Sequence, residues 1–313
     1  MTYASAVDGT DRVGLLEDGE IHGLRSPARL VDLLGDDGER LARAAEEARR
    51  DPAEVVPLGT ASLRAPVPVP PSIRDFMAFE EHVCNARGLP RGGLEPGFYD
   101  APVFYFTNPA AVLGPHDDVP VSPGSAAFDY ELELGVVVGR PGADLDPAEA
   151  EQHVAGYLVF CDWSARDLQK AEMRHGLGPA KGKDGATTLG PALVTPDELA
   201  PRRLGRAFDL QARVTVNGRP STTSNFRDPL WSIGELLAYA SRGTRLVPGD
   251  VIGSGTVGAG CLLELSALHG TEAYPWLHPG DRVQLSVEVL GDITTTVVEG
   301  APLRPLRRRD EHG

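Results

Sequence analysis

The sequence predicts a β-rich α+β protein with one large domain and a small N-terminal domain. Glycine and proline, 36 and 27 of the 313 residues, interrupt short runs rich in valine, leucine, threonine and phenylalanine, a rhythm typical of consecutive strands. A chain of this length with 41% hydrophobic residues can bury a sizeable core. The proline-rich stretch 57–71 cannot continue a helix and is interpreted as an extended linker, which divides the chain into domains 1–70 and 71–313.

The elements of the N-terminal part follow from local signals. Residues 12–24 predict a hairpin, because Asp18-Gly19 favours a tight turn between two strands. Ser26-Pro27 is typical of a helix start, and the helix that follows would carry Leu30, Leu33 and Leu34. A second helix is predicted over Glu39–Arg50.

In the main domain, several short runs have the composition of strands. They span residues 103–106, 130–138, 156–161, 210–216, 251–252, 282–290 and 293–299. Asn217-Gly218 and Gly291-Asp292 predict tight hairpin turns. A helix is predicted to begin at Asp75, with this carboxylate as its N-cap. The basic run 307–309 is interpreted as a solvated tail.

The composition argues against several classes of partner. With 45 Asp+Glu against 30 Lys+Arg, the chain repels nucleic-acid phosphates and anionic membrane surfaces. The N-terminus has neither a basic nor an apolar targeting region, and no apolar stretch approaches membrane-spanning length, so we expect a cytoplasmic protein. Cys84, Cys161 and Cys261 lie far apart and predict buried free thiols, not a disulfide framework or a zinc site.

One acid-rich strand, residues 129–133, is the strongest sign of chemistry. Side chains alternate across a strand, so Glu131 and Glu133 project from the same face, roughly 7 Å apart. Asp162 follows about thirty residues later in a second polar segment. An all-oxygen ligand set of this kind suits Mg²⁺, Mn²⁺ or Ca²⁺ and argues against zinc. The alternative is that these acids form the solvent face of a strand in an acidic protein.

Lysine is rare in this sequence. Lys170, Lys181 and Lys183 are the only lysines, and every other basic side chain of the Lys/Arg type is an arginine. A compact ammonium can sit close to an oxyanion, so one of the three is a candidate for a chemical role, the alternative being ordinary surface lysines. Two of them lie in the glycine-rich stretch 178–188, which either permits close approach to a ligand or forms a flexible surface loop.

Two further motifs allow more than one interpretation. If Asp75 caps a helix, His82 lies about 10 Å further along the helix axis. A substrate held by a metal ion at Asp75 can then reach His82 as a possible base. The alternative is a capping carboxylate and a packing histidine. Residues 253–258 match G-x-G-x-x-G, but no surrounding βαβ unit is visible, so a dinucleotide site is a weak interpretation.

These segments, in this order, resemble the fumarylacetoacetate hydrolase family from about Asp75 to Glu299. The resemblance rests on Asp75 with His82 seven residues later, residues 129–135, residues 162–169, Gly178-Pro179 before Gly182-Lys183, Ser254-Gly255-Thr256 and Leu263-Glu264-Leu265. It implies the mixed β-roll fold of that family for the main domain, usually assembled as a homodimer.

The resemblance also implies a role for each matching residue. A divalent metal ion, Mg²⁺ or else Mn²⁺ or Ca²⁺, would be bound by Asp75, Glu131, Glu133 and Asp162. The general base would be His82, with Glu264 as its orienting carboxylate and Lys183 as a cation supporting the substrate oxyanion. Thr187 would lie beside the metal. The substrate would be contacted by Gln169, Thr256 and an arginine, either Arg91, Arg87 or Arg166.

The departures from the family concern the substrate. Met77 and Met173 stand where enzymes acting on fumarylacetoacetate carry tyrosines, and methionine cannot donate those hydrogen bonds. The resemblance therefore implies a hydrolase that cleaves a carbon–carbon bond in another small anionic 1,3-dicarbonyl or acylpyruvate-type acid. A decarboxylase, hydratase or isomerase of a 2-oxo acid is the alternative within the family. A nicotinamide-dependent oxidoreductase and a non-catalytic metal-binding protein are the alternatives outside it.

Overall fold

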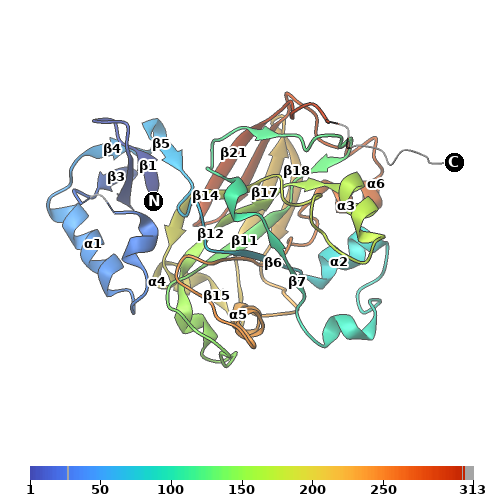
Figure 1. Ribbon diagram of the computed structural model, residues 1–313, viewed down its shortest axis with the longest axis horizontal. Helices are drawn as coiled ribbons and strands as arrows, with labels where there is room; N and C mark the ends of the chain where they lie inside the picture. Colours follow the sequence, from blue (N-terminus) through green and yellow to red (C-terminus); the bar gives the residue numbers. More distant parts are fainter. Residues whose placement is uncertain (27, 305, 307–313) are drawn as a thin grey trace.

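The computed structural model describes residues 1–26, 28–304 and 306 (Figure 1). Its largest sheet is mixed, with the order β7 (Phe104–Thr107), β6 (Ile73–Phe76), β19 (Val251–Gly253), β11 (Leu132–Val138), β12 (Val154–Asp162), β14 (Thr187–Val194) and β8 (Val112–Leu113). A second sheet has the order β18 (Arg219–Asn225), β17 (Gln211–Val216), β20 (Arg282–Val287), β21 (Gly291–Val298) and β9 (Val119–Pro120). The predicted β-rich α+β class is confirmed.

The N-terminal segment forms a third sheet, with the order β4 (Val55–Pro57), β3 (Glu20–Gly23), β2 (Asp11–Glu17), β1 (Thr2–Ala4) and β5 (Ser62–Arg64). Two short pairs complete the sheets, β10 (Phe128–Asp129) with β13 (Ser164–Ala165), and β15 (Arg203–Leu204) with β16 (Ala207–Phe208). The α-helices are α1 (Glu39–Arg50), α2 (Glu80–Arg87), α3 (Arg166–Met173), α4 (Pro196–Leu199), α5 (Ile233–Ser241) and α6 (Leu262–His269). Among the described residues, no helix has the length and apolar composition needed to cross a bilayer.

The main core lies between the seven-stranded and five-stranded sheets. Side chains alternate along β11, so Leu132, Leu134, Val136 and Val138 point into this core. They meet apolar side chains of β20 and β21, including Leu285. The opposite face of β11 carries Glu133, Gly135 and Val137, and every residue of the strand is buried. Both faces of the large sheet are therefore covered at β11.

The second face of the large sheet has its own apolar cluster. Val137, Phe160 and Ile73 lie in it together with Leu34 and Val67 of the N-terminal segment. In Figure 1 this segment lies on one side of the molecule, whereas α2, α3 and α6 gather on the opposite side. The N-terminal segment thus covers part of the same sheet face that carries Glu133. The domain boundary near residue 70 stays a prediction.

Most of the predicted elements are confirmed. The predicted strands of the main domain correspond to β7, β11, β12, β17, β19, β20 and β21, and helix α1 has the predicted bounds. The predicted turns Asp18-Gly19 and Asn217-Gly218 join β2 to β3 and β17 to β18. Cys84, Cys161 and Cys261 are buried free thiols within the part of the chain that the structure describes.

Four predictions of secondary structure are wrong. Gly291-Asp292 is not a hairpin turn, because both residues pair with β20 at the start of β21 and the turn lies at residues 288–290. Asp75 is not a helix N-cap, because it lies in β6 and α2 begins only at Glu80. The proline-rich stretch is not only a linker, because Ser62–Arg64 pairs with β1 as strand β5. The first predicted helix is a single 3₁₀ turn, Leu30–Leu33. Pro27, which was expected to open it, and the basic run 307–309 lie outside the described residues.

Candidate active site

Carboxylates gather at one end of the seven-stranded sheet, on the face away from the main core. Side chains alternate along a strand, so residues an even number of positions apart share a face. Asp75 of β6, Glu133 of β11 and Asp162 of β12 are related in this way to Ile73, Val137 and Phe160, and therefore lie on the face of the second apolar cluster. Glu131 lies just before β11 and forms an isolated bridge with Cys261. Asp75, Glu131, Glu133 and Asp162 are only 2%, 4%, 1% and 0% exposed. The interpretation of these acids as a solvent face is therefore wrong.

The glycine-rich stretch 253–258 makes room for two of these carboxylates. Gly253 pairs in register with Asp75, and a Cβ atom at Gly253 would lie 2.5 Å from Asp75 Oδ1 and 2.9 Å from Glu133 Oε2. Beyond it, the Gly255 N–H donates to Glu133 Oε2 at 2.8 Å, and Thr256 Oγ1 donates to Glu133 Oε1 at 3.3 Å. A backbone N–H that a dinucleotide site would direct to phosphate is thus bonded to a carboxylate.

The electrostatics of this cluster depend on burial. Burial raises the pKa of Asp75, and it raises the pKa values of Glu133 and Asp162 well above their usual range. The charge of Asp75 adds to the effect on Glu133. Burial also acts on Glu131, but the neighbouring Arg166 and Lys183 charges outweigh it and hold the pKa of Glu131 well below its usual range. Three of these groups therefore favour a bound proton or a cation.

The donor atoms of the cluster fit a hard divalent cation. Single oxygens of Asp75, Glu131 and Glu133 lie within 4.8 Å of one another. Within the described residues, the buried atoms Asp75 Oδ1, Asp162 Oδ1 and Thr187 Oγ1 have no hydrogen-bond partner. Thr187 begins β14 and pairs in register with Asp162. Oxygen donors alone suit Mg²⁺, Mn²⁺ or Ca²⁺, so these residues can hold such an ion.

Two polar side chains bind the carboxylates directly. The ammonium of Lys183, 3% exposed, donates to Glu131 and Asp162. The hydroxyl of Tyr105 lies 2.8 Å from Asp75 Oδ2 and also contacts Asp162, so its single proton can be donated to either carboxylate. Sequence analysis missed Tyr105, which reaches the site because β7 pairs with β6 and places it opposite Asp75. The only sequence signal was its place in a predicted strand.

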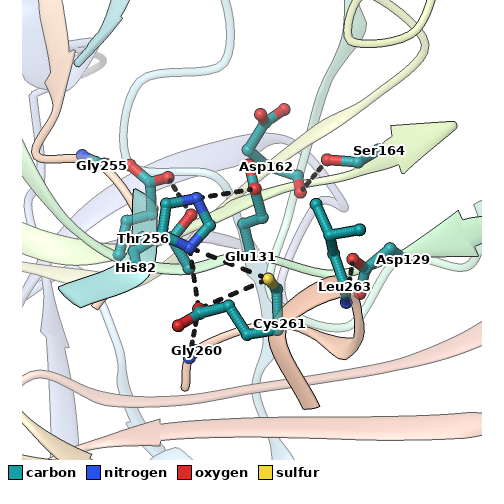
Figure 2. Close-up of polar contacts among 12 residues, drawn as sticks. His82, Asp129, Glu131, Asp162, Ser164, Gly255, Thr256, Gly260, Cys261 and Leu263 are labelled. Atoms are coloured by element: carbon teal, nitrogen blue, oxygen red, sulfur yellow. Dashed lines mark hydrogen bonds and ion pairs between the residues drawn. The ribbon is translucent and has the colours of Figure 1, made fainter. Parts of the chain in front are cut away.

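His82 and Glu264 form a hydrogen-bonded pair beside this cluster, one from α2 and the other from α6. His82 Nδ1 lies 2.7 Å from Glu264 Oε1, and His82 Nε2 lies 3.8 Å from Glu131 Oε1. Burial lowers the pKa of His82, but the Glu264 charge more than offsets it, so the pKa is raised. In Figure 2 the His82 imidazole lies between Glu131 and Cys261. The geometry leaves Nε2 as the ring nitrogen facing the cluster.

The Glu264 carboxylate is held by several donors. It accepts N–H bonds from Ala259 at 2.7 Å, Gly260 at 3.1 Å and Asn85 Nδ2 at 3.0 Å. Burial raises its pKa, but His82 and these donors lower it more, so the pKa of Glu264 lies below its usual value. Cys261 Sγ approaches Glu264 Oε1 at 3.5 Å and His82 Nδ1 at 3.9 Å. The thiol was not assigned a role from the sequence.

The predicted substrate-binding residues divide into two groups. Arg166 and Gln169 lie at the site, where Arg166 Nη2 donates to Glu131 Oε1 at 2.7 Å and Nη1 donates to Gln169 Oε1 at 3.2 Å. Arg91 lies in exposed ion pairs instead, 2.7 Å from Glu81 and 2.7 Å from Asp228. The structure thus brings together Arg166, Gln169 and Thr256 but not Arg91. The contacts of Arg166, Gln169 and Thr256 with substrate stay predictions.

Residues 72–298 match the family model described as fumarylacetoacetate (FAA) hydrolase C-terminal. The chain belongs to the fumarylacetoacetate hydrolase family. Among relatives, it is 31% identical over 276 residues to the mitochondrial oxaloacetate tautomerase FAHD2A of Homo sapiens, covering 87% of this chain and 80% of that protein. It is 31% identical over 277 residues to the fumarylacetoacetase of Arabidopsis thaliana, covering 70% of this chain and 65% of that protein.

Solved structures of the family have the same fold. The fumarylacetoacetate hydrolase of Exiguobacterium antarcticum matches with a TM-score of 0.70 and 26% identity, over 95% of this chain and 98% of that chain. The 5-carboxymethyl-2-hydroxymuconate delta-isomerase of Mycobacterium smegmatis matches with a TM-score of 0.66 and 25% identity, over the same shares. The predicted family is confirmed. Its members are enzymes that include hydrolases, tautomerases and isomerases, and they usually bind a divalent metal ion.

Proposed function

We propose that this protein is a divalent-metal-dependent hydrolase that cleaves a carbon–carbon bond in a small anionic 1,3-dicarbonyl or acylpyruvate-type acid. The observation that supports this most is the His82–Glu264 pair beside the buried carboxylates, with Nε2 of His82 3.8 Å from Glu131. A base held at one nitrogen, with the other nitrogen facing the cluster, is the arrangement that activates water. Magnesium as the metal, a homodimer and a cytoplasmic location belong to the same proposal.

In this mechanism each group has one task. A divalent ion held by Asp75, Glu131, Glu133 and Asp162 would supply Lewis-acid polarisation of the substrate carbonyl. His82 Nε2 takes a proton from water, whose oxygen adds to the carbonyl carbon, while Glu264 stabilises the imidazolium through Nδ1–H.

The carbon–carbon bond then breaks, its electron pair leaves as an enolate, and the proton held by His82 passes to the enolate carbon. The products are a carboxylic acid and pyruvate or another ketone. Lys183 stabilises the negative charge that develops on oxygen. Gln169 and Thr256 are the proposed substrate contacts, whereas Arg91 lies outside the site in exposed ion pairs with Glu81 and Asp228.

A second function uses the same site without adding water. The relative from Homo sapiens is named an oxaloacetate tautomerase, and the Mycobacterium smegmatis structure is named a delta-isomerase. These names favour a tautomerase or isomerase of a 2-oxo acid as the alternative, in which His82 moves a proton between carbon and oxygen. A decarboxylase would use the same carboxylates and release CO₂.

Product analysis on the metal-stripped protein separates these functions. Acylpyruvate is supplied with and without Mg²⁺ or Mn²⁺, and pyruvate, carboxylic acid and CO₂ are quantified, while the keto and enol forms of oxaloacetate are followed by absorbance. Metal-dependent pyruvate plus acid supports the hydrolase, whereas oxaloacetate tautomerisation alone replaces it with the second function. His82→Ala is expected to lower kcat by about 10²–10⁴-fold. His278→Ala, at an exposed histidine, serves as the matched control.

A further inference from the structure

A buried bridge of Asp129 and Arg166 joins the carboxylate cluster to the helix that carries Glu264. We propose that these two residues are a positioning pair, which fixes Glu131 relative to the His82–Glu264 base. The pair was not assigned this role by the sequence or by the family resemblance, which made Arg166 a candidate substrate contact. The catalytic part of this inference rests on the proposed function, whereas its effect on metal binding does not.

Asp129 holds the beginning of α6. Its Oδ1 accepts the backbone N–H of Leu262 at 2.8 Å. Its Oδ2 accepts the backbone N–H of Leu263 at 3.0 Å, a contact seen in Figure 2. These are the first two residues of α6, and Glu264 is the next. A carboxylate bonded to two backbone N–H groups at a helix start fixes both the position and the direction of that helix. Asp129 therefore sets where Glu264 stands.

Arg166 carries the connection to Glu131. Its Nε donates to Asp129 Oδ2 at 2.8 Å, and its Nη2 donates to Glu131 Oε1 at 2.7 Å. Its Nη1 donates to Gln169 Oε1 at 3.2 Å, so the planar guanidinium is held from three directions. Glu131 Oε1 is also the atom 3.8 Å from His82 Nε2. The path from α6 through Asp129 and Arg166 thus ends at the oxygen that faces the base.

The burial of Asp129 and Arg166 favours a positioning role over direct contact with substrate. Asp129 is 0% exposed and Arg166 is 7% exposed. A substrate that bound the guanidinium by displacing Asp129 or Glu131 would leave a buried carboxylate without its cation, which is costly. Asp129 itself is fully covered by protein. An effect of changing Asp129 on catalysis must therefore act through Arg166, Glu131 or α6.

The test compares Arg166→Lys, Asp129→Asn and the double variant with wild type. Affinity for Mn²⁺ is measured by calorimetry, and kcat and KM are measured on acylpyruvate. Each single change is expected to weaken Mn²⁺ binding and lower kcat by roughly 10–100-fold, with KM little changed, as for other residues that orient metal ligands. The double variant is expected to be no worse than the more impaired of the two single variants, because both changes break the same connection. Arg203→Lys, at an arginine bonded to both oxygens of Glu151 at 2.6 and 2.8 Å, is the control.

Several results would overturn the positioning role. If Arg166→Lys raises KM with Mn²⁺ affinity intact while Asp129→Asn has no effect, Arg166 is a substrate contact and the pair has no positioning role. If Asp129→Asn does not fold, Arg166→Lys alone decides, since unchanged Mn²⁺ affinity then refutes the inference. If wild type turns over no acylpyruvate, the proposed hydrolase function fails, but Mn²⁺ affinities and the ¹⁵N resonances of His82 still show whether the pair orders the site.

Discussion

Replacing Glu264 with glutamine tests whether this carboxylate orients the base. Glu264 Oε1 receives His82 Nδ1–H and the Gly260 N–H, and Oε2 receives N–H groups of Asn85 and Ala259. A glutamine NH₂ on the Oε2 side leaves the Asn85 and Ala259 donors without an acceptor. On the Oε1 side it leaves only the Gly260 N–H without one, because a neutral His82 can accept the amide proton at Nδ1, so this orientation is favoured. At about 1–3 kcal/mol for a buried unpaired donor, we expect Glu264→Gln to lower the free energy of unfolding by about 1–3 kcal/mol.

The effect on catalysis follows from the imidazole. With the amide NH₂ facing Nδ1, the ring is held with its proton on Nε2 and can no longer accept one from water, so kcat is expected to fall by about 10²–10⁴-fold. The loss of stability in Glu264→Gln depends on pH. The folded-state pKa of Glu264 lies below its unfolded value of 4.5, so its contribution is present above that pH and is lost as pH falls through the folded pKa.

The assays are urea unfolding and kcat at saturating metal. Glu235→Gln is the matched control, because Glu235 is the third residue of α5, as Glu264 is of α6, and its carboxylate accepts the Ser232 N–H and hydroxyl at 2.7 Å each. That control is expected to lose about 0.5–1.5 kcal/mol of stability and none of the turnover. Wild-type kcat in Glu264→Gln would show that His82 does not depend on Glu264 for its orientation.

Two further substitutions address the metal site. Glu133→Gln is expected to raise the melting temperature of the metal-stripped protein while weakening Mn²⁺ binding, because it removes a buried negative charge beside Asp75. Burial and Asp75 raise the pKa of Glu133 well above its ordinary 4.5, so the stability from its protonated form is present below that pH and is lost as pH rises through the folded pKa. The gain in melting temperature of the Glu133→Gln variant over wild type should therefore grow as pH rises above 4.5, and a gain that shrinks contradicts this. Gly253→Ala is expected to weaken Mn²⁺ binding at least about tenfold, since its Cβ would crowd two carboxylates, whereas Gly59→Ala, with nothing within 4 Å, should leave calorimetric affinity unchanged.

The sequence predicted the acidic half of the site because its signal is local. Glu131 and Glu133 lie two residues apart on one predicted strand, so their shared face follows from alternation alone. Asp75 shows where local signals fail. Its neighbours resemble a helix start, but the backbone of residues 73–76 pairs with β7 on one side and β19 on the other. Pairing between strands outweighs a capping preference of about 1 kcal/mol, and no local pattern shows it.

The residues that sequence analysis missed are those placed by distant pairing. Tyr105 meets Asp75 only because β6 and β7 are antiparallel in that register. Asp129 meets Leu262, 133 positions later in the chain, because the start of α6 lies beside β10. The order of side chains along one strand can be predicted from its sequence. The neighbour across the sheet depends on the register, which a single sequence does not specify.

The charges at the site explain why a cation belongs to it. Buried acids at or beside the cluster are Asp75, Asp129, Glu131, Glu133, Asp162 and Glu264, whereas the buried cations that bind them are Lys183 and Arg166. His82 adds at most one positive charge. Burying unpaired carboxylates is costly, so the cluster must bind protons or a metal ion, and the raised pKa values of Asp75, Glu133 and Asp162 express the first option. Because Lys183 and Arg166 already neutralise Glu131 and its neighbours, the charge that remains lies on Asp75 and Glu133, beside Gly253. A divalent ion there replaces bound protons, so metal affinity should rise with pH for the same physical reason that the metal-free cluster resists ionisation.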